Sequence, residues 1–313
     1  MIYTLTANLA IDLFISTKEL KPNYVNRTEY FETSANGKGV NVSLILKKLG
    51  IESVVTGFRG GFTGSYIKEE MDRQGIKNYL PEVDGITRIN VFTHVVEENR
   101  EYTQVNPGPG VTQKAKDDLL AYFSKTLKEG DILSINGSFP DGIDEEYLDA
   151  LFNLMENKKV KVVIDNSSKI IPNLCKYKPF LIKPNELELC SWFDEKVEGP
   201  DQFISLSRKM IEKGVENVLL SLGKEGAMLI NKDRVLKCNA PKGQVVNTAM
   251  AGDTLLATFI GEKIKGKTDE DALKKAICAG SSTAFSKGLT DFSDVDDLMN
   301  QVEAKNIGGG KDD

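Results

Sequence analysis

The chain has 313 residues, of which 40% are hydrophobic and 27% are charged, and these proportions are typical of a folded globular protein. Its net charge of −6 argues against nucleic acid or an anionic membrane surface as the main partner. No apolar run approaches the length of a membrane-spanning helix and no signal peptide is visible, so we expect a cytoplasmic protein.

The cysteines and the histidine exclude several kinds of active site. Cys175, Cys190, Cys238 and Cys278 are widely spaced and form no Cys-x-x-Cys pair, which is typical of buried free thiols in a reducing compartment. The single histidine, His94, lies in a predicted strand. A zinc site with several histidines is therefore excluded.

The N-terminal segment is predicted to be mostly extended. Residues 2–8 are predicted to form a strand, and the next extended run, residues 11–15, carries a single acid, Asp12. If Asp12 points inward, it can accept hydrogen bonds from sugar hydroxyls. Otherwise it is a turn residue or a charge on an edge strand.

A glycine-rich stretch, residues 36–41, comes immediately before an apolar helix that ends at Gly50. Lys38 is flanked by two glycines there, and a lysine at such a helix start suits a phosphate or sugar oxygen. The spacing is not that of a Walker A motif. Taken alone, the stretch is also compatible with a solvent-exposed loop lysine.

Residues 87–96 and 100–105 are two extended runs around a short polar turn, and this pattern predicts a hairpin. Alternate residues of a strand share a face. Arg88 and Asn90 therefore lie on the same face of the first run.

Beyond a Pro-Gly-Pro-Gly break at residues 107–110, the chain alternates strands with helices, as in a parallel α/β sheet. Four predicted strands end in polar or glycine-containing turns: residues 131–136, 160–165, 180–183 and 218–222. Ligands of open parallel sheets bind outside the carboxyl ends of the strands. We therefore expect these turns to converge on one rim.

Residues 247–254 open the next apolar helix, which we expect to cover residues 253–265. A helix start has unpaired N–H groups and the positive end of the helix dipole, and Ala251 and Gly252 leave room for a phosphate to approach. Asp253 could then take a proton from an attacking hydroxyl. The alternative is that Asp253 is only an N-cap. A further helix, residues 269–287, follows, and we expect the tail, residues 308–313, to be disordered.

In their order and spacing, these motifs resemble those of the PfkB (ribokinase-like) carbohydrate kinases, nearly from end to end. Residues 36–41 match the N-terminal signature of that family, residues 250–253 its C-terminal signature, and residues 185–188 its Asn-x-x-Glu motif. Further matching segments are residues 87–90, 137–140, 183–185 and 221–226. Within the family, the chain is most similar to the 1-phosphofructokinase and tagatose-6-phosphate kinase branch.

Two residues depart from the signatures, since Met250 and Asn36 stand where the family carries glycine. If the position of Met250 needs a positive φ, methionine would be strained there. Asparagine accepts left-handed conformations better than most residues. Neither change removes Lys38, Gly252 or Asp253.

The resemblance implies an α/β fold, with a ribokinase-like three-layer α/β/α main domain and a small β-sheet lid. The main domain would comprise residues 1–10, 33–85 and 106–313, and the lid residues 11–32 and 86–105. Lids of this family cover the sugar and often pair with the lid of a second subunit, so we expect a homodimer.

The implied activity is ATP-dependent phosphorylation of a ketohexose phosphate to a bisphosphate, with fructose 1-phosphate as the first choice. Tagatose 6-phosphate is the alternative substrate. An alternative of another class is a catalytically weak regulator that binds a sugar phosphate, which only Met250 favours.

The resemblance also assigns roles to individual residues. Asp253 would be the base, and the N–H groups of residues 251–253, which follow Met250, would form the anion hole. We expect the helix start to favour the ionised form of Asp253 and so to lower its basicity. Mg²⁺ would be held through water by Asn185 and Glu188. The sugar phosphate would contact Asp12, Arg27, Gly37, Lys38, Asn41, Arg88, Asn90 and Ser138. Asp12 and Asn41 would bind its hydroxyls, and Lys38, Arg88, Asn90, Ser138 and Arg27 would hold the phosphate that it already carries. ATP would contact Lys183, Asn185, Ser221, Gly223, Glu225, Gly226, Gly280, Ser282 and Ser286.

Overall fold

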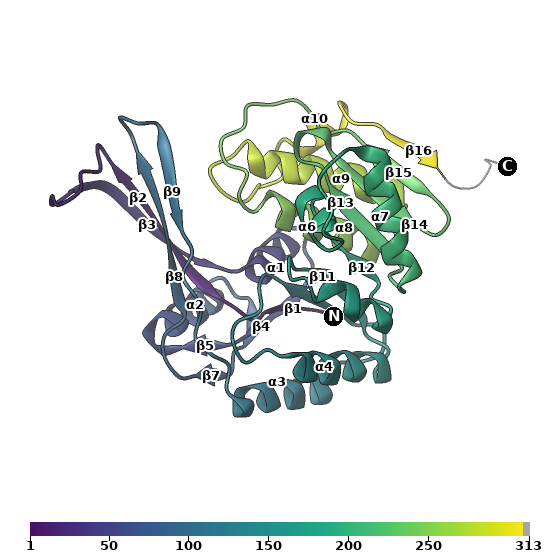
Figure 1. Ribbon diagram of the computed structural model, residues 1–313, viewed down its shortest axis with the longest axis horizontal. Coiled ribbons are helices and arrows are strands. Elements are labelled where there is room, and N and C mark those ends of the chain that lie inside the picture. The colour runs from purple at the N-terminus through teal and green to yellow at the C-terminus, as the bar shows by residue number, and fades with distance from the viewer. Residues whose placement is uncertain (309–313) are drawn as a thin grey trace.

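The computed structural model describes residues 1–308, and the predicted tail lies outside this range except for Gly308. Gly308 ends a strand, so the prediction of disorder is wrong at that residue. The described chain forms a large sheet with helices on both faces and a smaller sheet that projects from one side (Figure 1). The predicted α/β class and its three layers are confirmed.

Within the described residues the large sheet has ten strands, in the order β16-β15-β14-β13-β12-β11-β10-β1-β4-β6. Pairing is parallel from β13 to β6 and antiparallel from β13 to β16. Strands β1, β4 and β10 are buried at every position, as expected of parallel strands covered on both faces. The bounds are β1 (Ile2–Thr6), β4 (Ser53–Gly57), β6 (Lys77–Tyr79), β10 (Ile132–Asn136), β11 (Lys161–Asp165), β12 (Leu181–Ile182), β13 (Asn217–Ser221), β14 (Ala227–Asn231), β15 (Val235–Cys238) and β16 (Ala304–Gly308).

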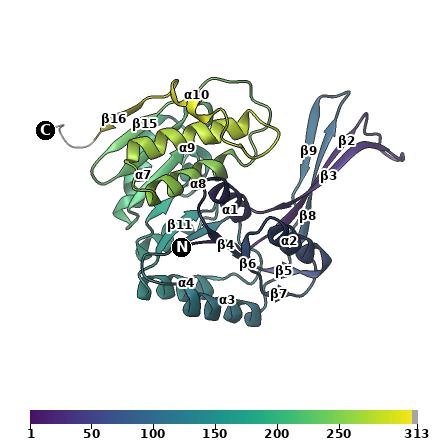
Figure 2. The ribbon, with the colours of Figure 1, turned by 180° about the vertical axis from the view of Figure 1, so that it is seen from behind.

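Three apolar cores lie between the helices and the sheets of the described chain, and the two larger ones cover the two faces of the large sheet. One core contains Phe123 and Phe152 of α3 and α4, and the other contains Phe259 and Ile277 of α8 and α9. Figures 1 and 2 show these two helix pairs on opposite sides of the sheet. The helices are α1 (Lys38–Lys48), α2 (Gly61–Arg73), α3 (Gln113–Thr126), α4 (Glu145–Asn157), α5 (Ile171–Leu174), α6 (Glu186–Ser191), α7 (Pro200–Glu212), α8 (Ala251–Ile264), α9 (Asp269–Ala284) and α10 (Val295–Met299). Two 3₁₀ turns are η1 (Cys175–Tyr177) and η2 (Gly223–Glu225).

The smaller sheet has the order β3-β2-β8-β9 and extends away from the main body (Figure 2). Its strands are β2 (Ala10–Thr17), β3 (Thr28–Asn36), β8 (Arg88–Val95) and β9 (Arg100–Gln104). β8 and β9 pair antiparallel, which confirms the predicted hairpin. β3 continues to Asn36, beyond the predicted lid boundary at residue 32. A further two-stranded sheet pairs β5 (Arg59–Gly60) with β7 (Glu82–Val83).

The residues singled out by composition lie where the sequence predicts. All four cysteines are free and buried, and His94 lies in β8. None of the helices in residues 1–308 has both the length and the apolar character needed to cross a membrane.

Candidate active site

Polar side chains gather at the carboxyl ends of neighbouring parallel strands, as expected. Asp165 ends β11 and lies opposite Asn136, the last residue of β10, while Lys183 follows β12 directly. All three are buried. The beginnings of α1 and α8 face the same rim, because Asn41 of α1 contacts Asp253 of α8.

The start of α8 has an unusual backbone. Met250 is its N-cap and adopts φ 63° and ψ −6°, in the left-handed region that favours glycine. The position therefore does require a positive φ, and methionine is strained there by about 1–2 kcal/mol. Asn36, by contrast, does not have a positive φ. Its side chain, not its backbone, is what distinguishes it from glycine.

Asp253 is buried in the first turn of α8, where its Oδ2 accepts a hydrogen bond from Asn41 Nδ2 at 2.8 Å. Burial, together with the negative charge of Asp165, raises the pKa of Asp253 to about 7, against the opposing effect of Lys38. The expectation that the helix start would lower its basicity is wrong. Removal of the carboxyl from water outweighs the helix dipole.

A buried ion-pair cluster lies beside Asp253. Lys38 Nζ is 3.0 Å and Lys183 Nζ 3.3 Å from Asp165 Oδ1. Burial alone would raise the pKa of Asp165, but the charges of Lys183 and Lys38 hold it below its ordinary value. Asp165 therefore stays ionised through the pH range in which Asp253 takes up or releases its proton. Sequence reasoning left it out, although its place at the end of a buried strand was a usable signal.

Gly252 leaves space for Lys183. A Cβ atom on Gly252 would lie 3.3 Å from Lys183 Nζ, so the amine closely approaches the first turn of α8. This places a cation next to the N–H groups of Gly252 and Asp253, whereas the N–H group of Ala251, also predicted for the anion hole, donates to Thr248 O at 3.4 Å. The arrangement suits an anion at the start of α8.

The sugar-side residues form a second group around Asp12. Asn90 Nδ2 donates to Asp12 Oδ1 at 2.8 Å, and Asn36 Nδ2 donates to Asp12 Oδ2. Burial raises the pKa of Asp12, and the hydrogen bonds from Asn90 and Asn36 oppose that rise. The buried side chain of Asp12 thus points inward, which decides between the two interpretations of the sequence.

Arg88 and Ser138 meet through Asn8. Arg88 Nη2 donates to Asn8 O and Nη1 to Asn106 O, both at 3.2 Å, and Asn8 Nδ2 donates to Ser138 Oγ at 3.1 Å. Asn8 and Asn106 are residues that the sequence analysis missed. Lys38 belongs to the Asp165 cluster instead, so the two cations predicted for one phosphate lie in separate clusters.

Asn185 and Glu188 form a capping box at the start of α6. Glu188 N donates to Asn185 Oδ1 at 2.8 Å, and Asn185 N donates to Glu188 Oε2 at 2.9 Å. Burial alone would lower the pKa of the Lys38 amine, but the charges of Asp165, Asp253 and, to a smaller extent, Glu188 raise it. Residues 1–308 contain no group of three histidine, cysteine or acidic side chains arranged for a metal ion. The role of Asn185 and Glu188 with Mg²⁺ stays a prediction.

The residues predicted for ATP fall into two groups. Ser221 pairs with Asn185 and is followed by the turn η2, which Gly223 and Gly226 enter and leave with positive φ. Glu225 lies within η2. This group continues the rim from β12 to β13.

The remaining residues, Gly280 and Ser282 on α9 and Ser286 just after its end at Ala284, have internal contacts instead. A Cβ atom on Gly280 would lie 3.0 Å from Ala251 O, so this glycine lets α9 pack closely on α8. The buried Ser282 hydroxyl contacts Thr290 and Asp294. Ser286 Oγ donates to Ser282 O at 2.9 Å.

Gly37 and Arg27, both predicted to bind the sugar phosphate, lie in different surroundings. Gly37 is needed for close approach, because a Cβ atom there would lie 2.8 Å from Thr6 Cγ2. Arg27 is exposed, outside the strands of the smaller sheet, and its backbone oxygen accepts a hydrogen bond from Thr17 Oγ1. The structure does not bring Arg27 to the other predicted residues of this chain.

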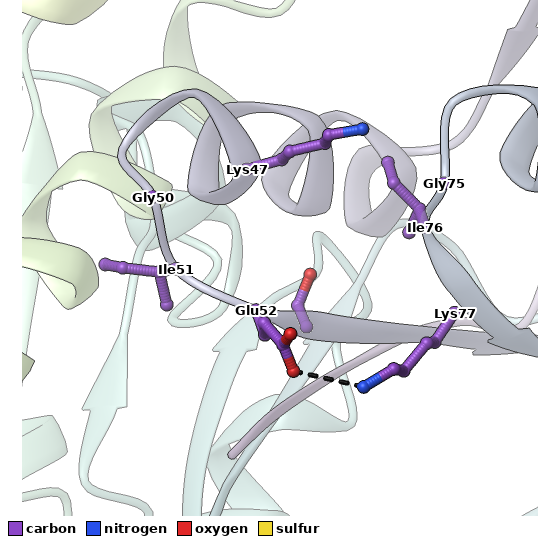
Figure 3. Close-up of a pocket in the computed structure, with 8 residues that line it drawn as sticks. Lys47, Gly50, Ile51, Glu52, Gly75, Ile76 and Lys77 are labelled. Carbon is purple, nitrogen blue, oxygen red and sulfur yellow. Dashed lines mark hydrogen bonds and ion pairs between the residues drawn. The ribbon is translucent and has the colours of Figure 1, made fainter.

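A pocket of about 260 Å³ lies away from this rim, between the carboxyl ends of α1 and α2 and the beginnings of β4 and β6 (Figure 3). Lys77 pairs there with Glu52 at 3.1 Å, and Lys47 donates to Gln74 O. It contains none of the predicted site residues. We therefore place the active site at the rim.

Residues 5–296 match the model of the pfkB family carbohydrate kinases. The chain belongs to this family. It is 41% identical over 308 residues to a D-tagatose-1-phosphate kinase of Bacillus licheniformis, covering 98% of this chain and 100% of the relative. It is 35% identical to a 1-phosphofructokinase of Borreliella burgdorferi, covering 98% and 99%.

Solved structures agree with this family assignment. A Staphylococcus aureus protein of proposed phosphofructokinase function is 33% identical, covers 99% of this chain and 100% of that one, and has a TM-score of 0.86. Phosphofructokinase-2 of Escherichia coli in complex with fructose-6-phosphate has a TM-score of 0.88 at 22% identity, with coverage of 96% and 98%, and shows the fold alone. This PfkB protein is a carbohydrate kinase, as the sequence predicts, and membership of a kinase family implies that it uses ATP.

Proposed function

We propose that this enzyme transfers a phosphoryl group from ATP to the C6 hydroxyl of a ketohexose 1-phosphate, giving a 1,6-bisphosphate. The observation that carries the proposal is the separation of the two cation clusters. Arg88 lies with Ser138 and Asn8, whereas Lys38 lies with Asp165, beside Asp253. One cluster suits a phosphate already on the sugar, and the other suits the phosphoryl group in transfer.

Two relatives support a 1-phosphate rather than a 6-phosphate. Their names give tagatose 1-phosphate at 41% identity and 1-phosphofructokinase activity at 35%. C6 carries the remaining primary hydroxyl of such a sugar. The higher identity favours tagatose 1-phosphate, and fructose 1-phosphate, its C4 epimer, is the second candidate. We therefore propose tagatose 1-phosphate in place of tagatose 6-phosphate, the alternative substrate suggested by the family resemblance.

Asp253 would take the proton of the C6 hydroxyl. Its Oδ2 already accepts the hydrogen bond from Asn41, so Oδ1 is the oxygen left for the substrate. A pKa of about 7 matches a base that works near neutral pH. Lys38 and Lys183 would counter the charge of the phosphoryl group, together with the N–H groups of the first turn of α8.

Asn185 and Glu188 fit a hydrated Mg²⁺ better than a directly bound one. The capping box uses Asn185 Oδ1 and Glu188 Oε2, while Glu188 Oε1 has no recorded hydrogen bond within residues 1–308. These oxygens can accept from metal-bound water. The ion would supply charge neutralisation of the ATP phosphates. The turn that contains Gly223, Glu225 and Gly226, together with Ser221, would receive the nucleotide.

The test is an ADP-release assay with Mg-ATP against tagatose 1-phosphate, fructose 1-phosphate, fructose 6-phosphate, tagatose 6-phosphate and free fructose. We expect turnover of the two 1-phosphates, with tagatose 1-phosphate preferred. Equal use of free fructose, or a preference for a 6-phosphate, would overturn the proposal. Arg88→Ala should raise the KM for the sugar phosphate and leave the KM for ATP unchanged.

A further inference from the structure

We propose that Asn36 is a positioning residue that links the sugar-binding carboxylate to the catalytic base. Its carboxamide lies between Asp12 and Asn41, and Asn41 in turn contacts Asp253. The hydrogen bonds therefore form a continuous chain, Asp12–Asn36–Asn41–Asp253. The inference deepens the proposed function and rests on it for the roles of Asp12 and Asp253.

The direction of every bond in this chain is set by the carboxylates at its ends. Asp12 Oδ2 can only accept when ionised, so Asn36 must present its NH₂ group there. Asn36 Oδ1 then faces two donors, Gly37 N at 2.6 Å and Asn41 Nδ2 at 3.0 Å. A flipped Asn36 amide would turn its NH₂ group toward these two donors and its oxygen toward Asp12 Oδ2, which is an acceptor.

The orientation of the Asn41 amide is fixed in the same way, by the acceptors that face it. Its Nδ2 has two hydrogens, one directed to Asn36 Oδ1 and the other to Asp253 Oδ2. Asn36 thus keeps the NH₂ group of Asn41 turned toward the base. A glycine at position 36, as in the family signature, would offer no oxygen to Asn41 and no donor to Asp12.

This chain has two consequences for the reaction. The hydrogen bond from Asn41 favours the ionised form of Asp253 and opposes the rise of its pKa. The donors Asn36 and Asn90 occupy one oxygen each of Asp12, which fixes the plane of that carboxylate against the sugar. Asn36 therefore acts on both the sugar affinity and the protonation of the base, through residues that it holds.

The test compares three single variants in kcat, KM and the pH profile of kcat/KM. Asn90 contacts only the Asp12 end of the chain of hydrogen bonds, so Asn90→Ala should raise the KM for the sugar without shifting the pH profile. Asn41 contacts the Asp253 end, so Asn41→Ala should shift the pH profile toward higher pH. Asn36→Gly should do both, with a shift of about half to one pH unit, which is the effect of one lost hydrogen bond.

Asn99→Gly is the matched control. Asn99 is exposed in the turn between β8 and β9, with φ 48°, where glycine fits without strain. It should behave as the unchanged enzyme. Asn36→Asp is the second variant, because it keeps an oxygen for Asn41 and Gly37 but replaces the donor to Asp12 with a carboxylate oxygen and a negative charge; its KM for the sugar should rise. An N36G variant with an unchanged pH profile and unchanged KM would overturn the proposal.

A second measurement needs no substrate, so it separates this inference from the proposed function. Unfolding free energies would be measured for Asp12→Asn, Asp253→Asn and the double variant, with and without N36G. Non-additivity that disappears in the N36G background supports the link even if every sugar in the kinase assay fails. Strictly additive effects in the presence of Asn36 would overturn it.

Discussion

At the scale of single residues, two neighbouring carboxyls of the candidate site, Asp165 and Asp253, have pKa values that are shifted in opposite directions. Asp165 has Lys38 and Lys183 as partners, and these charges hold its pKa low despite complete burial. Burial and the negative charge of Asp165 raise the pKa of Asp253 to about 7, and the hydrogen bond from Asn41 opposes this rise without cancelling it. Neighbouring carboxyls with opposite shifts indicate different roles. Asp253 has the value of a base, and Asp165 that of a fixed anion which orients two lysines.

The pKa of Asp253 predicts the pH dependence of activity. A base must be ionised, so kcat/KM should rise with pH and level off above about pH 7. Asp253→Asn should lose about 10²–10⁴-fold in turnover and should no longer show this rise. Steady-state kinetics from pH 5 to 9 measure both. Near-normal turnover by the variant would contradict the assignment of the base.

The same pKa predicts a dependence of stability on pH. Asp253 has a higher pKa in the folded chain than its ordinary value of 3.8, so the folded state binds more protons between about pH 4 and pH 7. This contribution to stability is complete at low pH and is lost as the pH rises through that window. Asp253→Asn should therefore raise the melting temperature at pH 8 and leave it nearly unchanged at pH 4. The opposite trend would show that Asp253 is not destabilised by burial.

Met250 offers a test of backbone strain. Because its φ is 63°, Met250→Gly should stabilise the fold by about 1 kcal/mol, which differential scanning calorimetry can measure. Ala249→Gly is the control, since Ala249 has no positive φ, and glycine there should destabilise slightly. If both variants lose stability, contacts of the Met250 side chain outweigh the strain.

At the scale of elements, three helix starts meet the rim. α1 brings Lys38 and Asn41, α8 brings Asp253, and α6 begins with the capping box of Asn185 and Glu188. The last pair has a structural function already, because it satisfies two backbone N–H groups at the start of α6. A role with Mg²⁺ would be a second use of the same carboxylate.

Glu188→Gln separates these two uses. Glutamine can also complete a capping box, so the melting temperature should change little. The lost charge should raise the Mg²⁺ concentration needed for half-maximal activity, by about tenfold for one lost charged contact. Magnesium titrations of turnover measure this. An unchanged midpoint would leave Glu188 with the capping role alone.

At the scale of the whole molecule, helix α2 contacts the base of the smaller sheet, while the rest of this sheet projects away from the main body and presents exposed aromatic residues (Figure 1). Phe31 and Tyr30 on β3 are 68% and 57% exposed. Large exposed apolar side chains on a projecting sheet favour an interface. We propose, in line with the family resemblance, that this sheet is a lid and that two lids pair in a homodimer.

Light scattering tests the dimer. We expect twice the mass of the 34.5 kDa chain at working concentration. Phe31→Glu should shift the mass toward that of a monomer, because burying an unpaired charge at an interface is costly. A monomeric mass for the unchanged protein would remove this proposal.

Much of the candidate site could be proposed from local sequence. Asp12, Lys38 and Asp253 follow from strand ends and helix starts, and their order along the chain indicates the family. The contacts of Asn36 and Asp165 could not be predicted, since each joins residues far apart in the chain. From the sequence, the replacement of glycine by Asn36 suggests only an effect on the backbone conformation. The structure shows that the Asn36 side chain hydrogen-bonds to Asp12 and Asn41.

The amino-acid sequence by itself determined the layered α/β fold, the position of the rim and the kinase family, because hydrophobic periodicity and turn residues are local properties. The tertiary structure decided which charges meet. It pairs Lys38 with Asp165, whereas the sequence predicts that Lys38 binds the same phosphate as Arg88. It also raises the pKa of Asp253, whereas the helix start alone suggests a lowered pKa. The reason is physical: desolvation and Coulomb interactions depend on distances between segments, and folding alone sets those distances.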